Sequence, residues 1–331
     1  MSPPSCSPAH CHSRNPVAVT LQLSSTLNGV LLVNLGTPAA ATPQAVRDYL
    51  AEFLSDPRVV QLPRWLWLPI LFGFILRTRP SSSAKRYAAI WTPEGSPLAV
   101  HTRQQALLLG KILAERNIKV AYAMRYGQPS IADGLKSLSG REIVVMPLYP
   151  QFSRSTTESV RDVIGAKARM VESFHDHPAY IGALAALVQR HWAAHGRGDK
   201  LVMSFHGLPK RSVDQGDPYQ TQCIATAKIL AGSLRIPPSD YVVTFQSRFG
   251  AAEWLQPYTE PSLIALAKQG AKRVDVVCPG FVSDCLETLE EIALEARRAF
   301  LGAGGREFHA LPCLNETPEW IVAMARIAAP G

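Results

Sequence analysis

Residues 29–38 read GVLLVNLGTP, an apolar run that ends in Gly-x-Pro. A second run of the same kind, residues 200–209, reads KLVMSFHGLP and carries a histidine directly before its glycine. Short apolar runs bounded by turn-forming residues are typical of strands that are buried on both faces. Because Gly and Pro end strands in many unrelated proteins, the likeness is either chance or a sign of two related halves.

The same alternation continues along the chain. Further β-branched runs predict strands at residues 119–124, 141–146, 241–245 and 273–278, with helical stretches between them. Thr42 and Pro43 open the first helix, as an N-cap and a first-turn proline. Strands that alternate with helices form parallel sheets covered on both faces, so the sequence predicts an α/β fold. Residues 144–149 (VVMPLY) and 276–281 (VVCPGF) form a second similar pair, which favours two α/β halves.

Composition and charge narrow the classes of function. The chain has 331 residues, 47% of them hydrophobic, which is enough for two units with separate cores. The net charge of +8 suits nucleic acid, anionic lipid or an acidic ligand. The Lys and Arg residues are scattered, however, and form no nucleic-acid-binding signature, so we expect no nucleic acid partner. No stretch reaches the roughly 20 apolar residues of a membrane-spanning helix.

The six cysteines contain no C-x-x-C pair, so neither a disulfide framework nor a zinc ribbon is indicated. A reducing cytoplasm is the expected location. Residues 1–27 are rich in Ser and Pro and lack the apolar core of a signal peptide, which predicts a disordered tail. His10, Cys11 and His12 lie in this tail, where a metal site would require order that its composition does not favour.

His206 follows a predicted strand at its carboxyl end, the edge where ligands bind in open α/β sheets. An imidazole at this place can bind a metal ion or take protons near neutral pH. The alternative is a structural histidine bonded to a loop carbonyl group. Gly207 lets another group approach closely, which favours a functional role.

An acidic run follows the last of these strands, residues 283–291 (SDCLETLEE). Capping by Ser283 or Asp284, with acids in the first turn, would account for part of it. In an α-helix, Asp284, Glu287 and Glu291 would lie on one face at spacings of three and four. Such a row of carboxylates can guide a cation or accept protons, because close carboxylates raise one another's pKa.

Two further loops follow predicted strands and carry polar side chains. One holds Arg125 and Tyr126, and the other holds Tyr149. A guanidinium group suits a ligand carboxylate, whereas tyrosines in loops are often packing residues. The chain has no G-x-G-x-x-G, no G-K-[ST] and no G-x-S-x-G motif, so nucleotide-dependent and serine-hydrolase functions lose support.

An apolar run with two Trp residues occupies 65–76, with Arg residues before it and Arg and Lys residues after it. It is too short to cross a bilayer. Its composition suits either a surface that dips into lipid headgroups or an ordinary buried helix, and the sequence leaves both open.

Together, in their order and spacing, these motifs resemble the ferrochelatase family over residues 29–329. The matching motifs are residues 29–38, 53–60, 95–98, 124–126, 149–153, 204–209, 216–219, 245–250 and 278–292. The resemblance implies a lyase that inserts Fe²⁺ into protoporphyrin IX to give protoheme in heme biosynthesis. Iron is then a substrate, protoporphyrin IX is the partner ligand, and no cofactor is bound permanently.

The resemblance also implies an α/β fold of two Rossmann-like, chelatase-type domains, each a parallel sheet flanked by helices, with a cleft between them. We expect the first domain at residues 28–172, with an apolar lip at about 58–80. The second is expected at 173–311, and residues 312–331 should form a C-terminal helix that packs back on the first. The lip over the pocket mouth implies peripheral contact with the inner membrane face.

The residue roles implied by the family fall into four groups. The catalytic and metal-binding pair is His206 and Glu287, and the metal path continues through Asp284 and Glu291. The expected porphyrin-binding residues are Leu35, Arg58, Ser96, Arg125, Tyr126, Tyr149 and Trp254. The expected lip residues are Trp65, Trp67, Leu68, Ile70 and Leu71.

The sequence departs from some members of the family in two places. Relatives that hold an iron–sulfur cluster have a cysteine where this chain has Arg154, and they carry a cysteine-rich C-terminal tail. Because such a cluster needs four thiolates, we predict none here. Relatives that prefer coproporphyrin have a Tyr in the first loop, where this chain offers Leu35, which favours protoporphyrin.

Three other functions compete with this one. A tetrapyrrole carrier would bind the porphyrin without inserting metal, and the acidic run argues against it. A chelatase for cobalt or nickel would take another macrocycle, whereas the apolar run suits an apolar ring. A two-lobed solute-binding protein would need a signal peptide.

Overall fold

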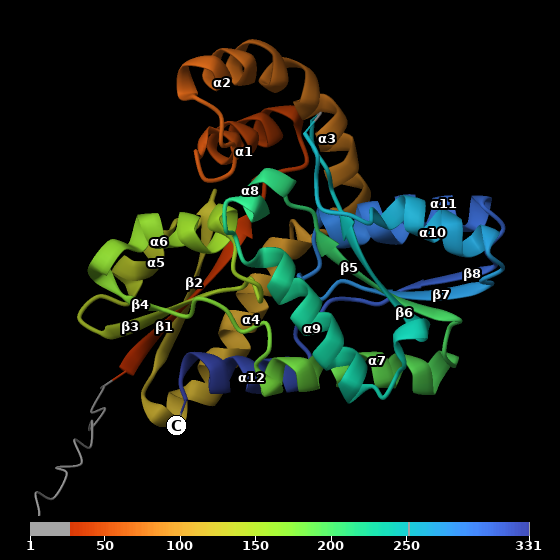
Figure 1. Ribbon diagram of the computed structural model, residues 1–331. Helices are drawn as coiled ribbons and strands as arrows, with labels where there is room; N and C mark the ends of the chain where they lie inside the picture. The colour runs from red at the N-terminus through yellow and green to blue at the C-terminus, as the bar shows by residue number, and fades with distance from the viewer. Residues whose placement is uncertain (1–26, 251, 331) are drawn as a thin grey trace, which may run out of the picture.

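The strands of the chain form two separate four-stranded parallel sheets in the computed structural model, which describes residues 27–250 and 252–330 (Figure 1). The first sheet has the order β2-β1-β3-β4. Its strands are β1 (Leu27–Gly36), β2 (Lys119–Tyr126), β3 (Glu142–Pro147) and β4 (Arg169–Met170). The second sheet has the order β6-β5-β7-β8. Its strands are β5 (Lys200–His206), β6 (Tyr241–Gln246), β7 (Arg273–Val277) and β8 (Glu307–Ala310).

The two sheets share one topology, because the first strand of each lies between the second and the third in chain order. This agreement favours two related halves over a chance likeness of the two Gly-x-Pro runs. All six strands expected from the sequence are confirmed. The sequence does not single out β4 and β8, which have only two and four residues.

The helices lie around the sheets, and along the chain they alternate with the strands (Figure 1). The α-helices of the first half are α1 (Pro43–Ser55), α2 (Arg64–Ile70), α3 (Leu76–Ile90), α4 (Pro97–Leu113), α5 (Ile131–Ser137) and α6 (Ser159–Ile164). Those of the second half are α7 (Pro178–His195), α8 (Lys210–Asp214), α9 (Tyr219–Ser233), α10 (Thr259–Lys268), α11 (Arg297–Gly302) and α12 (Pro318–Ala328). The π-helices are η1 (Leu71–Ile75), η3 (Arg154–Glu158) and η6 (Glu287–Ala296). The short 3₁₀ turns are η2 (Ala114–Arg116), η4 (Gly165–Lys167) and η5 (Pro238–Asp240).

The first helix begins as its sequence predicts. The Thr42 hydroxyl oxygen accepts the N–H of Ala45 at 3.3 Å, and Pro43 occupies the first turn of α1. This cap satisfies a backbone N–H that has no partner inside the helix. Residues 29–34 of β1 are buried without interruption, as expected for a strand covered on both faces.

The largest apolar core joins the two sheets through a shared layer of helices. Leu109 of α4, Val188 of α7, Leu230 of α9 and Trp320 of α12 all belong to it. Separate cores cover the opposite face of each sheet, against α5 and α6 in the first half and α10 and α11 in the second. Helix α12 packs on both α4 and α7, so it touches both expected domains. The expected domain boundaries stay a prediction.

Helices α1, α2 and α3, with η1 between the last two, form a projection at the top of Figure 1. A small core of Leu54, Trp67, Leu71 and Leu76 holds it together. Within the described part of the chain, no helix is both long and apolar enough to cross a bilayer. The expected tail, including His10, Cys11 and His12, lies outside the described residues apart from Leu27.

Candidate functional site

His206 ends strand β5 at the carboxyl edge of the second sheet, where it is half-buried. Its ring nitrogen Nδ1 lies 2.7 Å from the carbonyl oxygen of Gly207. Because a carbonyl oxygen only accepts hydrogen bonds, we assign the proton of the neutral ring to Nδ1, which donates it. The other nitrogen, Nε2, then keeps its lone pair and can accept a proton or bind a metal ion.

The backbone beside His206 leaves no room for a side chain at position 207. A Cβ atom on Gly207 would lie 2.7 Å from the carbonyl oxygen of Gln246 and 3.2 Å from the ring of Trp254. The Gly207 N–H donates to that same carbonyl oxygen at 2.6 Å. Glycine therefore lets β6 and the Trp254 loop approach the end of β5 closely. Trp254 is held there by its own indole N–H, which donates to the carbonyl group of Phe249 at 2.9 Å.

Glu287 begins the π-helix η6, which follows strand β7. The N–H of Arg297, just past this helix, reaches back five residues to the carbonyl oxygen of Ile292, as in π-helical bonding. The side-chain amide of Gln246 donates to the main-chain carbonyl oxygen of Glu287 at 2.9 Å and accepts from the Ser204 hydroxyl at 2.6 Å. One chain of hydrogen bonds thus ties β5 and β6 to the start of η6.

Glu291 lies within electrostatic reach of both His206 and Glu287. Its carboxylate accepts the backbone N–H of Ser247 at 2.7 Å and also the Ser247 hydroxyl. Burial raises the pKa of Glu291, and the Glu287 carboxylate raises it further, while the Ser247 hydrogen bonds and His206 act in the opposite direction. The net rise in pKa makes Glu291 easier to protonate than an exposed glutamate.

Two tyrosines from the projecting helices complete the surroundings of Glu287. Tyr49 of α1 and Tyr87 of α3 are buried, and burial raises the pKa of both hydroxyls. The nearby Glu287 carboxylate raises both pKa values further. Both hydroxyls therefore stay protonated and can donate hydrogen bonds to an anion. No motif in the sequence singles out these tyrosines, because helices distant in the chain bring them to the sheet edge.

Asp284 lies just before η6 and has its own partners. Its Oδ2 accepts from the Asn315 amide at 2.7 Å, and its Oδ1 accepts from the Thr288 hydroxyl at 2.9 Å and the Cys313 N–H at 3.2 Å. The expectation that Asp284, Glu287 and Glu291 share one α-helical face is wrong, because the helix begins at Glu287 and winds as a π-helix. The wider turn still leaves Glu287 and Glu291 as neighbours. The place of Asp284 on a metal path stays a prediction.

A second polar constellation lies at the carboxyl edge of the first sheet, around Asp56 at the end of α1. Arg125 donates to Asp56 Oδ2 at 2.6 Å, and Tyr126 does so at 2.8 Å. The Ser159 hydroxyl donates to the same oxygen at 2.7 Å. Burial by itself would raise the pKa of Asp56, but these hydrogen bonds, the Arg58 N–H and the Arg125 charge lower it below the ordinary value. Asp56 is the shared acceptor of this network. It lies in residues 53–60, one of the stretches that resemble the family, but the sequence of that stretch does not indicate that Asp56 accepts these hydrogen bonds.

Tyr149, at the end of β3, has a buried hydroxyl with no hydrogen-bond partner among the described residues. Burial raises its pKa, Tyr126 raises it further, and Arg125 lowers it. A buried hydroxyl without a partner is uncommon, so this oxygen is suited to bonding with a ligand or water. The structure therefore brings together three of the expected porphyrin-binding residues, Arg125, Tyr126 and Tyr149.

The remaining expected porphyrin-binding residues differ in how much they are already engaged. Leu35 is half-buried at the end of β1, and Ser96 is buried, accepting from the Thr37 hydroxyl at 2.8 Å. Arg58 pairs with Glu158 at 2.6 Å and with Asp162 at 2.7 Å. Its charge is thus neutralised within the protein, and its expected role as a propionate ligand stays a prediction.

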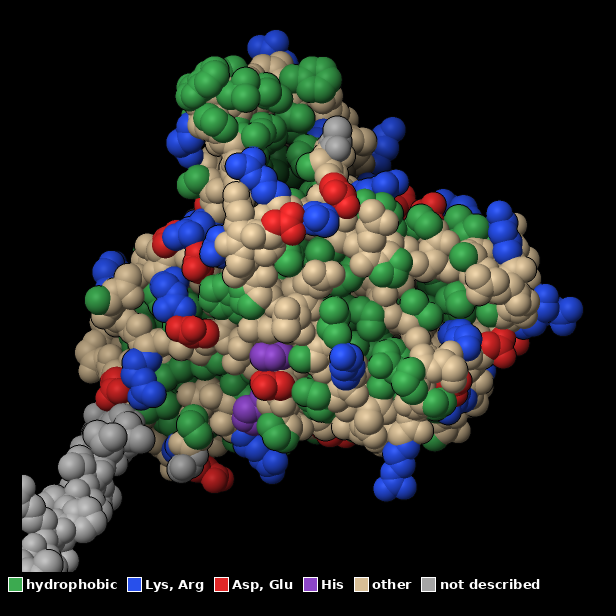
Figure 2. Space-filling view, in the orientation of Figure 1, with side chains coloured by type: hydrophobic (Ala, Val, Ile, Leu, Met, Phe, Trp, Pro, Cys, Tyr) green, Lys and Arg blue, Asp and Glu red, His purple; other side chains and the backbone are tan. Residues whose placement is uncertain are grey.

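The expected lip residues divide between a surface and the core beneath it. Trp65 and Ile70 are 79% and 40% exposed, whereas Trp67 and Leu71 are buried in the small core of the projection. Leu68 is intermediate. Phe72 and Phe74, at 49% and 63% exposure, extend the apolar surface. Figure 2 shows hydrophobic side chains gathered on the projection over α2.

Two open cavities of the described residues lie away from these constellations. One, of about 460 Å³, lies between α4 and β2 beside Gly110 and Val120, and the other, also of about 460 Å³, lies between α7 and α12. Both lack a convergent set of catalytic groups. The chemistry of the described residues therefore points to the strand ends.

The chain is similar to one protein family over nearly its whole length. The ferrochelatase family model matches residues 27–330. A ferrochelatase of Azoarcus sp. (strain BH72) is 57% identical over 316 residues, which are 92% of this chain and 87% of the relative. A ferrochelatase of Aromatoleum aromaticum is 56% identical over 335 residues, which are 97% of this chain and 89% of the relative.

Solved structures support the fold. SirB from Bacillus subtilis with Fe³⁺ has a TM-score of 0.51 at 11% identity, covering 92% of this chain and 96% of that one. The multi-domain protein DR2241 from Deinococcus radiodurans, described as structurally similar to chelatases, has a TM-score of 0.53 at 12% identity, covering 92% of this chain and 55% of that one. At such identities these likenesses concern the fold alone. The match over nearly the whole chain and identities above half show that the chain belongs to the ferrochelatase family.

Proposed function

We propose that this ferrochelatase inserts Fe²⁺ into protoporphyrin IX at the strand ends of the second sheet, with His206 and Glu287 as its central pair. The observation that supports the pair is the position of Glu291, which lies within electrostatic reach of both residues. An imidazole, two carboxylates and two protonated tyrosines thus gather around one sheet edge. This set of groups can both accept protons and hold a divalent cation.

His206 is proposed to accept protons from the pyrrole nitrogens or to meet the iron on one face of the ring. Two pyrrole protons must leave as the metal enters, so a base with an open lone pair is required. Nε2 provides it, since Nδ1 donates to the Gly207 carbonyl group and cannot turn away without losing that bond. Iron bound through an imidazole and carboxylates can also be released, as insertion requires.

Glu287 and Glu291 are proposed to form the carboxylate side of the site. Glu287 lies beside the hydroxyls of Tyr49 and Tyr87, which can orient its oxygens. Glu291 is held by Ser247, and its raised pKa suits a group that exchanges protons. We also propose that Asp284, which lies just before η6, is a member of the metal path.

The porphyrin is proposed to lie against the strand ends of both sheets. Tyr126, Tyr149 and Arg125 of the first sheet, together with Leu35 and Ser96, would contact it on one side, and Trp254 on the other. Arg125 and Arg58 are the proposed ligands for the propionates. A site that binds the ring in a bent form favours insertion, because bending directs nitrogen lone pairs at the metal.

The apolar surface of the projection is proposed to touch the membrane peripherally, on the cytoplasmic side of the inner membrane. Trp65, Phe72 and Phe74 are exposed there, and Arg64 and Arg77 flank them in sequence. Aromatic side chains bordered by basic ones suit the headgroup region of an anionic bilayer. The four described cysteines are free and buried, which supports a reducing compartment.

We also propose that the chain holds no iron–sulfur cluster. Arg154 stands where cluster-bearing relatives have a cysteine. Burial raises the pKa of Cys223, Cys278, Cys285 and Cys313, which disfavours the thiolate form that cluster ligands need.

The test is anaerobic incubation of the purified chain with protoporphyrin IX and Fe²⁺, followed by porphyrin absorption. The wild-type protein should form protoheme. His206→Ala and Glu287→Gln should each lower the rate by about 100-fold or more, because each removes a proton acceptor or metal ligand. Coproporphyrin III in place of protoporphyrin IX should react more slowly if Leu35 selects the ring.

Two matched variants serve as controls. His101→Ala removes a half-buried histidine that pairs with Glu316, and Glu260→Gln removes an exposed carboxylate in α10. Both should keep the wild-type rate. Folding of each variant is checked by circular dichroism. Porphyrin binding without turnover for any divalent metal in the wild-type protein would contradict insertion and leave a carrier.

A further inference from the structure

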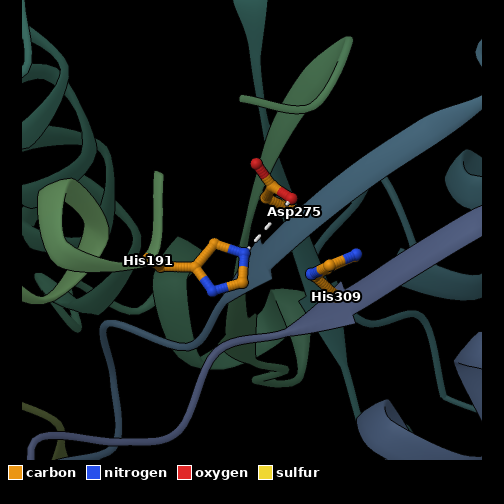
Figure 3. Close-up of side chains that lie close together, drawn as sticks. All are labelled: His191, Asp275 and His309. Atoms are coloured by element: carbon orange, nitrogen blue, oxygen red, sulfur yellow. Dashed lines mark ion pairs between the residues drawn. The ribbon is translucent and has the colours of Figure 1, made fainter. Parts of the chain in front are cut away.

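Three imidazole groups and a buried carboxylate meet on one face of the second sheet, away from the candidate active site. His191 and His195 lie one turn apart near the end of α7, and their ring centroids are 4.8 Å apart. His309 lies on β8, and Asp275 is its partner in register on β7. Figure 3 shows the His191 ring directed at Asp275, with His309 beside them. The sequence gives no sign of this group, because its members span more than a hundred residues.

The distances suit ligands of one metal ion better than direct hydrogen bonds. His191 Nε2 lies 3.6 Å from Asp275 Oδ1, which is long for a hydrogen bond. Two donors that each lie about 2.1 Å from one tetrahedral ion are about 3.4 Å apart. The candidate ligand atoms of His191, Asp275 and His309 all lie within 4.8 Å of one another. Small side-chain rotations would therefore bring three donors to one ion.

Two observations indicate that His191 and Asp275 are positioned to bind an ion. Nε2 of His191 is buried and has no hydrogen-bond partner among the described residues. Asp275 is 1% exposed, and its Oδ2 accepts the Trp192 indole N–H and the Gly198 N–H, each at 2.8 Å. These outer hydrogen bonds fix the carboxylate, as they do for many metal ligands.

Arg273 opposes cation binding, because its guanidinium group donates to Asp275 Oδ1 at 3.2 and 3.3 Å. An ion at Asp275 Oδ1 would take the place of one of these two long hydrogen bonds, because a carboxylate oxygen has only two lone pairs. His195 lies outside the set of ligand atoms that are within 4.8 Å of one another, but its exposed ring, 5.5 Å between centroids from that of His309, could turn to supply a third nitrogen. Nitrogen-rich sets of this kind select borderline divalent ions such as Zn²⁺ and Co²⁺ over Mg²⁺ and Ca²⁺.

The group is separate from the candidate active site. Asp275 pairs in register with Leu201 at the start of β5, whereas His206 ends that strand five residues later. At about 3.3 Å per residue, this is about 16 Å along the sheet. An ion bound at one place therefore would not share ligands with the other.

We propose that His191, Asp275 and His309, with His195 as a further ligand, bind one divalent ion of the Zn²⁺ type in a second metal site. An ion there would link the end of α7 to β7 and β8. Because the unfolded chain does not hold these residues together, binding would stabilise the folded state. This proposal does not depend on the insertion chemistry.

The test is titration of the full-length chain with Co²⁺ alone, followed by its visible ligand-field absorption. All proteins compared carry His206→Ala and Glu287→Gln, and also Ala or Ser at His10, Cys11 and His12, so that the central pair of the insertion site and the His and Cys residues of the N-terminal segment cannot bind the ion. We expect one Co²⁺ per chain with the strong absorption of low coordination. His309→Gln should weaken binding about tenfold or more, and the matched control His101→Gln should leave it unchanged.

A second measurement follows thermal unfolding instead of metal absorption. Zn²⁺ should raise the thermal unfolding temperature of the same background protein and should raise it less in His195→Gln. Equal Co²⁺ affinity in His309→Gln and the control would overturn the proposal, as would an unfolding temperature that does not respond to Zn²⁺. In the otherwise wild-type chain, His309→Gln should retain porphyrin metallation, so failure of this site and failure of the insertion site are distinguishable.

Discussion

At the scale of single residues, the site depends on groups whose protonation the fold determines. His206 is a proposed base only because the Gly207 carbonyl group holds the proton on Nδ1. Glu291 has a raised pKa because it is buried beside Glu287. Asp56 shows the opposite effect, because several donors converge on one of its oxygens. Residue type alone would assign ordinary pKa values to both carboxyl groups.

Asp56→Asn should lower the free energy of unfolding by about 2 kcal/mol at pH 7, because Arg125 loses a buried partner. The folded pKa of Asp56 lies below its ordinary value of 3.8, so its stabilisation is present above that pH. It is lost as the pH falls through the folded pKa. Urea unfolding at several pH values should therefore show a difference from wild type that shrinks in acid below about pH 4.

Asp48→Asn is the matched control, since Asp48 lies on the same helix α1 and is exposed. It should change the free energy of unfolding by less than about 0.5 kcal/mol at any pH. A gap between Asp56→Asn and wild type that widens in acid would show that the carboxylate is not the stabilising species.

At the scale of elements, the π-helix η6 carries the carboxylates, and helix α3 supports it from outside. Arg86 of α3 donates through Nε to Glu290 at 2.6 Å and also pairs with Glu295. Tyr87, the next residue, lies within electrostatic reach of Glu287. The helix that bears the apolar projection is thus joined to the helix that bears the proposed metal ligands.

Arg86→Gln should destabilise the protein and slow insertion, because Glu290 is 9% exposed and would lose its cation. The Arg86 side chain is itself 39% exposed, so solvent screening limits the expected loss to about 1 kcal/mol, or about 2 °C in thermal unfolding. Lys85→Gln, at an exposed position on the same helix, should change neither property. Equal behaviour of the two variants in melting and porphyrin absorption assays would rule out this coupling.

At the scale of the whole molecule, two sheets of identical strand order present their carboxyl ends to one region below the projection (Figure 1). A shared helical layer of α4, α7, α9 and α12 joins the two halves in one apolar core. The projection adds an exposed apolar surface at the same end of the molecule (Figure 2). A porphyrin that arrives through the membrane surface would therefore meet the lip before the strand ends.

Replacing Trp65, Phe72 and Phe74 together by Ser should weaken binding to anionic phospholipid vesicles by about tenfold or more. A fully buried aromatic side chain contributes about 1.5–3 kcal/mol, so even partial insertion exceeds this threshold. Vesicle co-sedimentation measures the effect. Leu107→Ser with Ile112→Ser, which removes exposed apolar side chains from α4, is the control and should bind as the wild-type chain does.

Insertion into detergent-dispersed porphyrin should continue in the triple variant, since none of its residues contacts the proposed reacting groups. Unchanged sedimentation of the triple variant would remove the membrane role from the projection. The apolar surface would then serve porphyrin entry alone.

Local patterns in the sequence predict the α/β class, six of the eight strands in the described residues, the position of His206 at a strand end and that of Glu287 in a helix after the last of these six strands. Those features depend on local patterns, because burial on both faces requires apolar runs and turns require Gly and Pro. Contacts in the tertiary structure revealed Tyr49, Tyr87, Asp56 and the cluster around His191, and the helix bounds showed that Asp284 lies before the start of η6. These features depend on contacts between distant segments and on π-helical winding. Neither of these produces a periodic pattern of apolar residues from which it could be predicted in the sequence.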